Sequence, residues 1–559
     1  MLKFSKIIIL ILICYISQSL FSQTKVAKNT YFISFKDKNE NLIENPNLFL
    51  SKKAIERRQK YDISIVYNDL PISQIYIDSI KNMGIKVLNK SKWLNGITIF
   101  SEDSILIESL KNIKFIENFS QETNNSESKK ITPNTEKIID YSNLPERLTN
   151  PKKVKKEKNV YNYGDSREQI EMNHGNYLHN NGFRGENMLI AITDGGFTKV
   201  NELSAFEQMR KENRILGGYN FVNQSDSIYG YGTHGTSCLS ILGGFEEGKL
   251  IGAAPKANFL ILISEDGKSE MPIEEYNWVS AAEFADSAGA DIISVSLGYF
   301  VFDEKELNHT YNDLDGKTSA ISKAATIAAS KGMIVCISAG NSGRTKEPWI
   351  TPPGDAENIL TVGAVEYNGN IAEFSSIGYT SDGRVKPDVL AVGHLNVYQT
   401  TTGRYFKGSG TSFAAPIISG LTACLWQKFP QKNNLEIIDA IKKSSTNYFN
   451  PNNTFGYGIP DFEIASLILE NDKNQIVGLS DVVVKSDFDI FLKNNINDKI
   501  NINIKNTKNK TVYKFSLIAG EKDIKHTVPI NSLQSGVYNI ELQINKEIIK
   551  KTVKIIKPF

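Results

Sequence analysis

The sequence predicts a doubly wound α/β domain with a parallel sheet, preceded by a smaller α+β domain and followed by a small antiparallel β-sandwich. Three changes of pattern along the 559 residues support this prediction. Short apolar runs alternate with helical stretches in the middle of the chain, and shorter strands and helices alternate before it. After it, apolar and polar residues alternate with turns between them. We expect about three or four structural units from a chain of this length.

The first 22 residues have the pattern of a secretory signal peptide. MLKFSK is short and basic, IIILILICYI is apolar, and Ser22 is a small residue after which cleavage is expected. The apolar run is short for a membrane span, which favours a cleaved signal peptide. An uncleaved membrane anchor is the alternative. No later stretch approaches eighteen apolar residues, so we expect a soluble mature protein that is secreted, either extracellular or at the cell surface.

Composition and cysteine usage narrow the range of partners. The formal net charge is +2, which gives no reason to expect nucleic acid as a partner, and we expect a monomer.

Cys14 lies in the predicted signal peptide, and Cys238, Cys336 and Cys424 lack CxxC spacing. Their apolar or small neighbours predict buried free thiols, with neither a catalytic nor a metal-binding role. One disulfide among the three stays open in an exported protein.

Residues 23–121 predict the smaller α+β domain. TYFISF and GITIF have strand character, and SKKAIERRQK and ISQIYIDSIKNMG have helical character. Residues 122–159 are polar and lysine-rich, with little apolar periodicity. We interpret them as an exposed linker and a region of processing, rather than as a binding patch.

Residues 160–470 predict the parallel sheet. Runs such as MLIAITD, NFLILIS, DIISVSLG, MIVCISAGN and ILTVGAV are short, continuous and rich in Ile and Val, as strands buried on both faces are. Helical stretches such as EYNWVSAAEFADSAG and SAISKAATIAASKG lie between them. Residues 475–559 contain KININIK and GVYNIELQI, whose alternation predicts the antiparallel β-sandwich.

Four polar residues stand in glycine-bracketed segments of the middle domain. Asp194 closes LIAITDGG, His234 lies in GYGTHGTSC, Asn341 lies in ISAGNSG, and Ser412 lies in GSGTSFAAP. Each has an ordinary structural interpretation: a turn or cap for the aspartate, asparagine and serine, and a satisfied structural histidine. In combination they fit one chemistry, because ligands meet the carboxyl ends of parallel strands.

That chemistry is nucleophilic attack by Ser412. A serine hydroxyl needs a base such as His234, and the histidine needs a carboxylate to fix its tautomer. An oxyanion also needs donors, which the Asn341 amide and the Ser412 N–H at a helix start can supply.

The four motifs, with IGAAPKA, SVSLG and GYGIPDF, resemble those of the subtilases, the subtilisin-like serine endopeptidases. The resemblance covers roughly residues 160–470 and implies a subtilisin-like fold. It implies that Asp194 orients His234, that His234 is the general base and acid, and that Ser412 is the nucleophile. Asn341 and the Ser412 N–H would form the oxyanion hole. Ser296, Leu297 and Gly298 match the strand on which the family binds extended polypeptide substrates.

Two further resemblances concern the flanking regions. Residues 24–121 resemble the subtilase propeptide, which implies a zymogen inhibited by its own propeptide. LQSGVYNIEL and KKTVKIIK resemble the sorting domains of type IX secretion cargo, which implies that secretion machinery as a partner. A plain accessory β-sandwich is the alternative for these last 80 or so residues.

Other functions fit less well. A lipase or esterase elbow, GxSxG, is not present around Ser412. A catalytically idle subtilase scaffold used for surface binding is the second alternative, although all four motif residues are retained. No cofactor is expected for catalysis. YNDLDGKT at 311–318 lacks the first ligand and the closing Glu of a calcium loop, so we expect a turn there. A structural calcium ion stays open, and no metal ligand is assigned.

Overall fold

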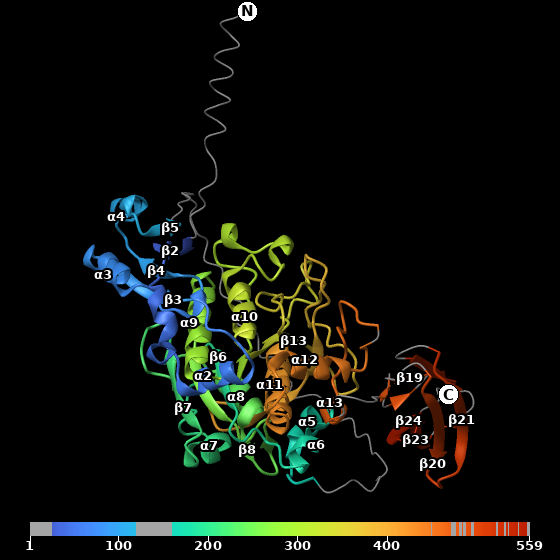
Figure 1. Cartoon of the computed structure of the whole chain (residues 1–559). Coiled ribbons are helices and arrows are strands. Elements are labelled where there is room, and N and C mark those ends of the chain that lie inside the picture. The colour runs from blue at the N-terminus through green and yellow to red at the C-terminus, as the bar shows by residue number, and fades with distance from the viewer. Residues whose placement is uncertain are drawn as a thin grey trace, which may run out of the picture.

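The computed structural model describes residues 25–118, 159–448 and 450–470, together with residues 477–555 apart from 480–482, 485–487, 493–496, 521–523, 530–532, 535 and 546. The predicted signal peptide lies outside the described residues, as does the predicted linker except for residue 159. Figure 1 shows the described parts coloured along the chain.

The N-terminal domain is an antiparallel sheet with helices, as the α+β prediction requires. Its strand order is β1-β2-β4-β3, with β5 paired to β2. Alternate residues of β2, including Ile33 and Phe35, are buried against Ile77 and Ile80 of α3. The elements are β1 (Lys25–Ala27), β2 (Thr30–Phe35), α2 (Lys52–Lys60), α3 (Gln74–Asn82), β3 (Lys86–Ser91), β4 (Gly96–Phe100), α4 (Ser104–Ser109) and β5 (Ile116–Asn118).

The central sheet has seven parallel strands in the order β14-β13-β12-β11-β6-β10-β7. The first strand along the chain, β6, lies inside the sheet between β10 and β11, so the winding reverses beside it. This confirms the doubly wound prediction. The strands are β6 (Leu189–Asp194), β7 (Ile215–Asn220), β10 (Asn258–Ile263), β11 (Ile292–Val295), β12 (Ile334–Ser338), β13 (Leu360–Val365) and β14 (Val389–Val392).

Helices cover both faces of this sheet, and each face has its own core (Figure 1). On one face α8 (His234–Gly243) packs against the long buried helix α11 (Thr411–Lys428). On the other face α9 (Ile273–Ala288) packs against α10 (Ala320–Ser330). The remaining helices are α5 (Arg167–Glu171), α6 (Gly175–Asn180), α7 (Glu207–Lys211), α12 (Asn434–Lys443) and α13 (Phe462–Glu470). Two short hairpins, β8 (Phe245–Glu246) with β9 (Leu250–Ile251) and β15 (Asn396–Gln399) with β16 (Tyr405–Gly408), complete this part.

The N-terminal domain docks on α9 through α2 and β3. A buried ionic network holds the two together. Asp286 of α9 accepts from Arg57 (2.6 Å) and Arg58 (2.9 Å), and Arg58 also pairs with Asp69 (2.8 Å). Lys331, which lies just after α10 of the central domain, donates to the same Asp69 at 2.9 Å. Arg57 and Arg58 come from the charge-rich segment SKKAIERRQK, and each is buried against an acidic partner, so the interface is built on charge complementarity.

A second acidic residue of α9, Glu283, accepts hydrogen bonds from the end of β3 and the turn that follows it. Its carboxylate accepts from the Ser91 hydroxyl (2.6 Å) and from the backbone N–H groups of Lys92 (2.8 Å) and Trp93 (2.9 Å). Burial raises the pKa of Glu283 to about 6, against the opposing effects of Lys92 and the hydrogen bonds. Burial alone would also raise the pKa of Asp286, but Lys92, Arg57 and Arg58 hold it below its usual value.

The C-terminal strands form antiparallel sheets, as predicted, with one parallel pair, β18 with β24. Alternate residues of β20, Ile500, Ile502 and Ile504, are fully buried, and their neighbours in sequence are not. The sheets are β18-β24-β23-β20-β21 and β17-β19-β22. The strands are β17 (Val477–Leu479), β18 (Val483–Val484), β19 (Phe488–Leu492), β20 (Lys499–Asn506), β21 (Thr511–Ile518), β22 (Ile524–Val528), β23 (Gly536–Ile544) and β24 (Glu547–Ile555).

Three smaller expectations can be compared with the structure. Cys238, Cys336 and Cys424 are buried and free, as predicted. In the segment 311–318, Asp315 accepts from the N–H groups of Lys317 and Thr318, both at 2.7 Å, which is a turn. Within the described ranges, every helix is too short or too polar to cross a bilayer.

Candidate active site

Asp194 lies at the carboxyl end of β6 and is fully buried. Its carboxylate accepts hydrogen bonds from the N–H of Gly195 (2.7 Å) and from Nδ1 of His234 (2.9 and 3.1 Å to the two oxygens). The segment after Asp194 and the segment before His234 approach closely because both carry glycine. A Cβ on Gly196, whose φ is +147°, would lie 1.9 Å from the backbone nitrogen of Gly232.

His234 is the first residue of α8, and its side chain is 28% exposed. Because a carboxylate can only accept, Nδ1 carries the proton and Nε2 is the basic nitrogen. Burial by itself lowers the pKa of His234, but the adjacent Asp194 carboxylate and, after it, Cys238 more than offset this effect, so the pKa lies well above its usual value. The pair therefore forms an oriented base with a stabilised protonated state.

Ser412 is the second residue of α11, and its carbonyl oxygen lies 3.5 Å from Sγ of Cys238 on the histidine's helix, α8. The ring of the next residue, Phe413, stacks against the His234 ring with centroids 6.2 Å apart. A Cβ on Gly410 would lie 2.9 Å from the Ser412 hydroxyl oxygen and 3.6 Å from Nδ2 of Asn341. The glycine therefore keeps space open next to the hydroxyl, and both polar groups border that space.

Asn341 follows β12, and its amide oxygen is held by Thr411. Oδ1 accepts from the Thr411 N–H (2.9 Å) and from the Thr411 hydroxyl (3.1 Å). With the oxygen fixed on that side, the NH₂ group is turned away from Thr411 and toward the space beside Gly410. Thr411 has no signal in the sequence except its place inside the GTSFAAP motif, and sequence reasoning gave it no role.

Ser296, Leu297 and Gly298 continue from β11, the strand beside β6. The Ser296 hydroxyl donates to the carbonyl oxygen of Ser412 at 2.8 Å, which fixes this segment next to the start of α11. Ser296 and Leu297 are buried, whereas Gly298 is exposed. The backbone is therefore accessible at the end of the segment, where an extended peptide could pair with it.

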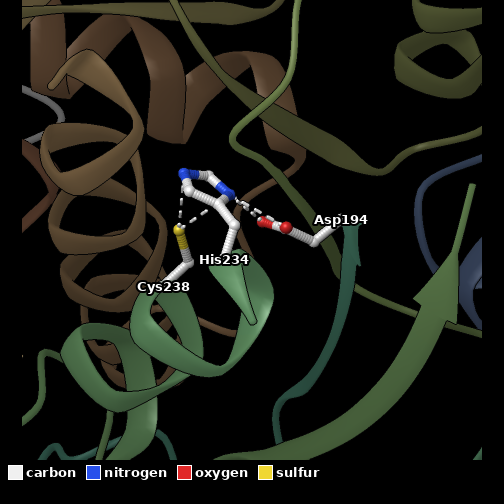
Figure 2. A group of neighbouring side chains, drawn as sticks. All are labelled: Asp194, His234 and Cys238. Carbon is white, nitrogen blue, oxygen red and sulfur yellow. Dashed lines mark hydrogen bonds and ion pairs between the residues drawn. The ribbon is translucent and has the colours of Figure 1, made fainter. Parts of the chain in front are cut away.

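One neighbour of the histidine was also missed from the sequence. Cys238 lies one turn after His234 on α8, and its Sγ is 3.8 Å from both ring nitrogens (Figure 2). The same Sγ is 3.5 Å from the Ser412 carbonyl oxygen. Two groups of potential metal ligands occur among the described residues: Asp194, His234 and Cys238, and His174, Asp461 and Glu463. In the second group His174 Nδ1 already pairs with Asp461 at 2.8 Å.

Comparisons with known proteins agree with this architecture. Residues 185–458 match the family described as the subtilase family, and residues 30–137 match the peptidase S8 propeptide domain of Bacteroidota. Serine protease AprX of Bacillus subtilis (strain 168) is 29% identical over 325 residues, which are 52% of this chain and 70% of that protein. Subtilisin BL of Lederbergia lenta is 26% identical over 292 residues, 52% of this chain and 94% of that protein.

Among solved structures, the prenylagaramide maturation protease PagA is 22% identical with a TM-score of 0.43, covering 53% of this chain and 98% of that one. The two family matches are in the order propeptide then peptidase, and the second spans the parallel sheet with its subtilisin-like winding. The chain therefore contains a serine protease domain of the subtilase (peptidase S8) family, with an S8 propeptide domain ahead of it.

Proposed function

We propose that this protein is a secreted endopeptidase, made as a zymogen, that hydrolyses polypeptides through Asp194, His234 and Ser412. The observation that carries the proposal is the contact of the buried Asp194 carboxylate with His234 Nδ1, next to a serine at the start of α11. That contact leaves Nε2 as the base, which a serine nucleophile requires.

In the first step, Ser412 Oγ attacks the scissile carbonyl carbon, and His234 Nε2 takes its proton. Negative charge moves to the carbonyl oxygen, where Asn341 Nδ2 and the Ser412 N–H donate to it. The C–N bond then breaks, and His234 returns the proton to the leaving amine. Asp194 stays ionised and stabilises the imidazolium.

In the second step, water attacks the acyl-enzyme ester. His234 accepts a proton from the water, the same donors stabilise the second oxyanion, and the C–O bond to Ser412 breaks as the hydroxyl recovers its proton. The bound peptide would pair with the backbone of Ser296, Leu297 and Gly298, which brings its scissile bond to Ser412. The Ser296–Ser412 hydrogen bond supports this arrangement.

The N-terminal domain is proposed to act as the intramolecular inhibitor. Its buried ionic network on α9 supports a docked, stable zymogen. The last strand of this domain, β5, is followed by the region in which we expect cleavage. Release then requires a cut in the chain and the loss of buried ion pairs.

Secretion and sorting are also proposals. The apolar run of residues 7–16 supports export by a signal peptide, and the motifs within residues 475–559 support sorting by the type IX machinery. Deleting residues 475–559 in a bacterium that has this machinery should retain the protein in the periplasm. Equal amounts of full-length and truncated protein in the culture medium would overturn the sorting role.

The triad is tested by comparing the parent with Ser412→Ala, using cleavage of an unfolded protein and the mass of the purified chain. Ser419→Ala is the matched control, because Ser419 is a buried serine on the same helix whose hydroxyl donates to Ala415 O at 2.8 Å. The parent and the control should cleave substrate and lose their N-terminal segment, while Ser412→Ala stays intact and inactive. A folded parent without activity would favour the idle scaffold instead.

A further inference from the structure

We propose that Glu265, Glu270 and the Tyr299 hydroxyl form a subsite that binds a lysine or arginine side chain of the polypeptide substrate, a few residues from the scissile bond. The subsite rests on the proposed peptidase function, and it adds the class of substrate that the enzyme prefers. The four catalytic motifs of the sequence give no sign of this preference, because the three residues lie in segments outside them.

The two segments leave the sheet on either side of Asp194. In the sheet β6 lies between β10 and β11, and Asp194 is the last residue of β6. Residues 264–270 follow β10, and residues 296–303 follow β11. The two segments meet where the N–H of Asp303 donates to the carbonyl oxygen of Glu270 at 2.9 Å. The acidic residues of the first segment therefore lie close to the segment on which the substrate is proposed to pair.

The segment after β10 also borders the catalytic residues. Oε2 of Glu265 would lie 3.8 Å from a Cβ on Gly195, the neighbour of the catalytic aspartate. The hydroxyl of Tyr231, from the segment before α8, donates to the Asp266 carboxylate at 3.1 Å. A substrate side chain bound at Glu265 would therefore belong to a residue near the scissile bond.

Tyr299 places a hydroxyl without a partner among these carboxylates. The residue is 1% exposed, and within the described part of the chain its hydroxyl oxygen makes no hydrogen bond. Burial raises the pKa of Tyr299 well above its usual value, and nearby carboxylates add to this effect. In order of effect they are those of Glu265, Glu274, Glu270 and Glu275. Because a buried hydroxyl without a partner costs free energy, an N–H donor from a bound side chain would stabilise this arrangement.

The acidic residues also repel one another. Glu274 is fully buried, and its oxygens accept from two backbone N–H groups of the same loop at 2.7 and 2.8 Å. Burial, followed by the charges of Glu270 and Glu265, raises the pKa of Glu274 to about 10. Burial, followed by the charge of Asp303, raises the pKa of Glu270 to about 7. A positive charge bound among them would offset this repulsion.

A basic side chain fits this arrangement better than a metal ion does. Within the described residues, the three glutamates are not among the groups whose ligand atoms all lie within 4.8 Å of one another, so one ion would not reach them together. An ammonium group has three N–H donors and a guanidinium group has five, which can bond separately to the carboxylates and to the Tyr299 hydroxyl. Hydrogen bonds of this charged kind are the stronger ones.

The spacing of the substrate segment gives the position of the basic residue. Ser296 is hydrogen-bonded to the Ser412 carbonyl oxygen, and Tyr299 is three residues further on. In an extended chain this corresponds to about 10 Å. The basic residue should therefore lie about three residues from the scissile bond.

The predicted processing region has the matching charge. Residues 122–159 include SESKK and PKKVKKEK. If the chain processes itself there, the first polypeptide that enters the active site supplies lysines to an acidic subsite.

Peptides that differ at a single residue test this preference. The processed parent is given peptides with lysine, norleucine or glutamate at each position up to four residues on either side of the scissile bond, and kcat/KM is measured. At one position, about three residues from the bond, kcat/KM for lysine should exceed that for norleucine at least about tenfold. A hydrogen bond to a charged group is worth roughly 10- to 100-fold.

Substitutions assign the preference to the subsite. Glu265→Gln and Glu270→Gln each remove one charge and keep the side-chain shape, and Tyr299→Phe removes only the hydroxyl, so each should lower the lysine-to-norleucine ratio. Glu306→Gln is the control, because it removes an exposed carboxylate from the segment after Asp303 and should keep the parent ratio. Glu270→Lys should raise the glutamate-to-norleucine ratio, which loss of a merely structural contact would not do.

The failures of the subsite and of the peptidase function are distinguishable. Equal cleavage of the lysine and norleucine peptides at every position would overturn the subsite alone, and so would a lysine preference that both glutamine variants retain. A folded parent that cleaves none of the peptides would contradict the proposed function and the subsite with it.

Discussion

Arg58 of the propeptide domain and Asp286 of the peptidase domain form an ion pair of 2.9 Å whose side chains are 1% and 0% exposed. They are separated by 228 positions along the chain, and the same Arg58 nitrogen also reaches Asp69. A charge this deeply buried is tolerated only while its partners are present. The domain interface therefore depends on a small number of charged residues.

Removing Arg58 should destabilise the zymogen strongly. Arg58→Ala in the Ser412→Ala background leaves two buried carboxylates with one partner fewer, and we expect a loss of about 3–5 kcal/mol in unfolding free energy. Chemical denaturation of the full chain measures it. Lys52→Ala is the control, because the Lys52–Glu56 pair is exposed and should contribute less than about 1 kcal/mol. Equal effects of the two substitutions would show that the buried network does not hold the domain.

Docking of the propeptide domain should weaken as the pH rises through about 6. The pKa of Glu283 is raised by burial to about 6, from a usual value of 4.5. An acid with a raised pKa binds its proton more tightly when docked, so its contribution is complete below about pH 4.5 and is lost above pH 6. The rise in the pKa of Glu283 from 4.5 to about 6 corresponds to about 2 kcal/mol of docking free energy.

Hydrogen exchange of β3, measured from pH 4.5 to 7 and corrected for intrinsic rates, follows this docking. The parent should lose protection across that range, and Glu283→Gln, which has no titrating carboxyl, should show a flatter dependence. A slope that Glu283→Gln leaves unchanged would assign the effect to other groups.

The charge on Asp194 should set both the rate and the pH profile of hydrolysis. Asp194→Asn removes the carboxylate that raises the pKa of His234 and that fixes its tautomer. We expect kcat to fall about 10⁴-fold, as for loss of the corresponding carboxylate in other serine proteases. The pKa seen in kcat/KM should move down, since burial is then opposed only by Cys238. A large loss of rate with an unchanged pH profile would contradict the account of the pKa.

Asn341 should act on the transition state and hardly on substrate binding. Removal of one oxyanion donor in subtilisin lowers kcat about 10²–10³-fold, and Asn341→Ala should do the same here with a KM close to that of the parent. Steady-state kinetics on a peptide substrate separates the two constants. A raised KM with normal kcat would instead make Asn341 a ground-state binding residue.

The sequence was sufficient for the strands that are buried on both faces, because β6, β10, β11, β12 and β13 are continuous apolar runs. It did not reveal β7, because the ILGGYN segment of this strand contains two glycines and is only partly buried. Strand order also could not be predicted, because it depends on contacts between segments far apart in the chain.

In the candidate site, too, the sequence predicts some residues, and others are revealed only by the fold. Asp194, His234, Asn341 and Ser412 are visible in sequence because each needs a glycine-rich surrounding, whether for close approach or for space. The position of Cys238 beside His234 depends on the phase of α8, and its chemical environment depends on Asp194, which is 40 residues from His234. Arg57 and Arg58 look like solvent-facing charges in SKKAIERRQK, and only the docked structure reveals their partners.

The most direct test of the central claim is to label the processed protein with a serine-directed fluorophosphonate and to locate the adduct by peptide mass spectrometry. The proposed mechanism predicts one phosphonylated residue per chain, Ser412, because its proposed base, His234, is oriented by the buried Asp194 carboxylate. A folded, processed protein that takes no label, or that takes it on another serine, would contradict the assignment of Ser412 as the nucleophile.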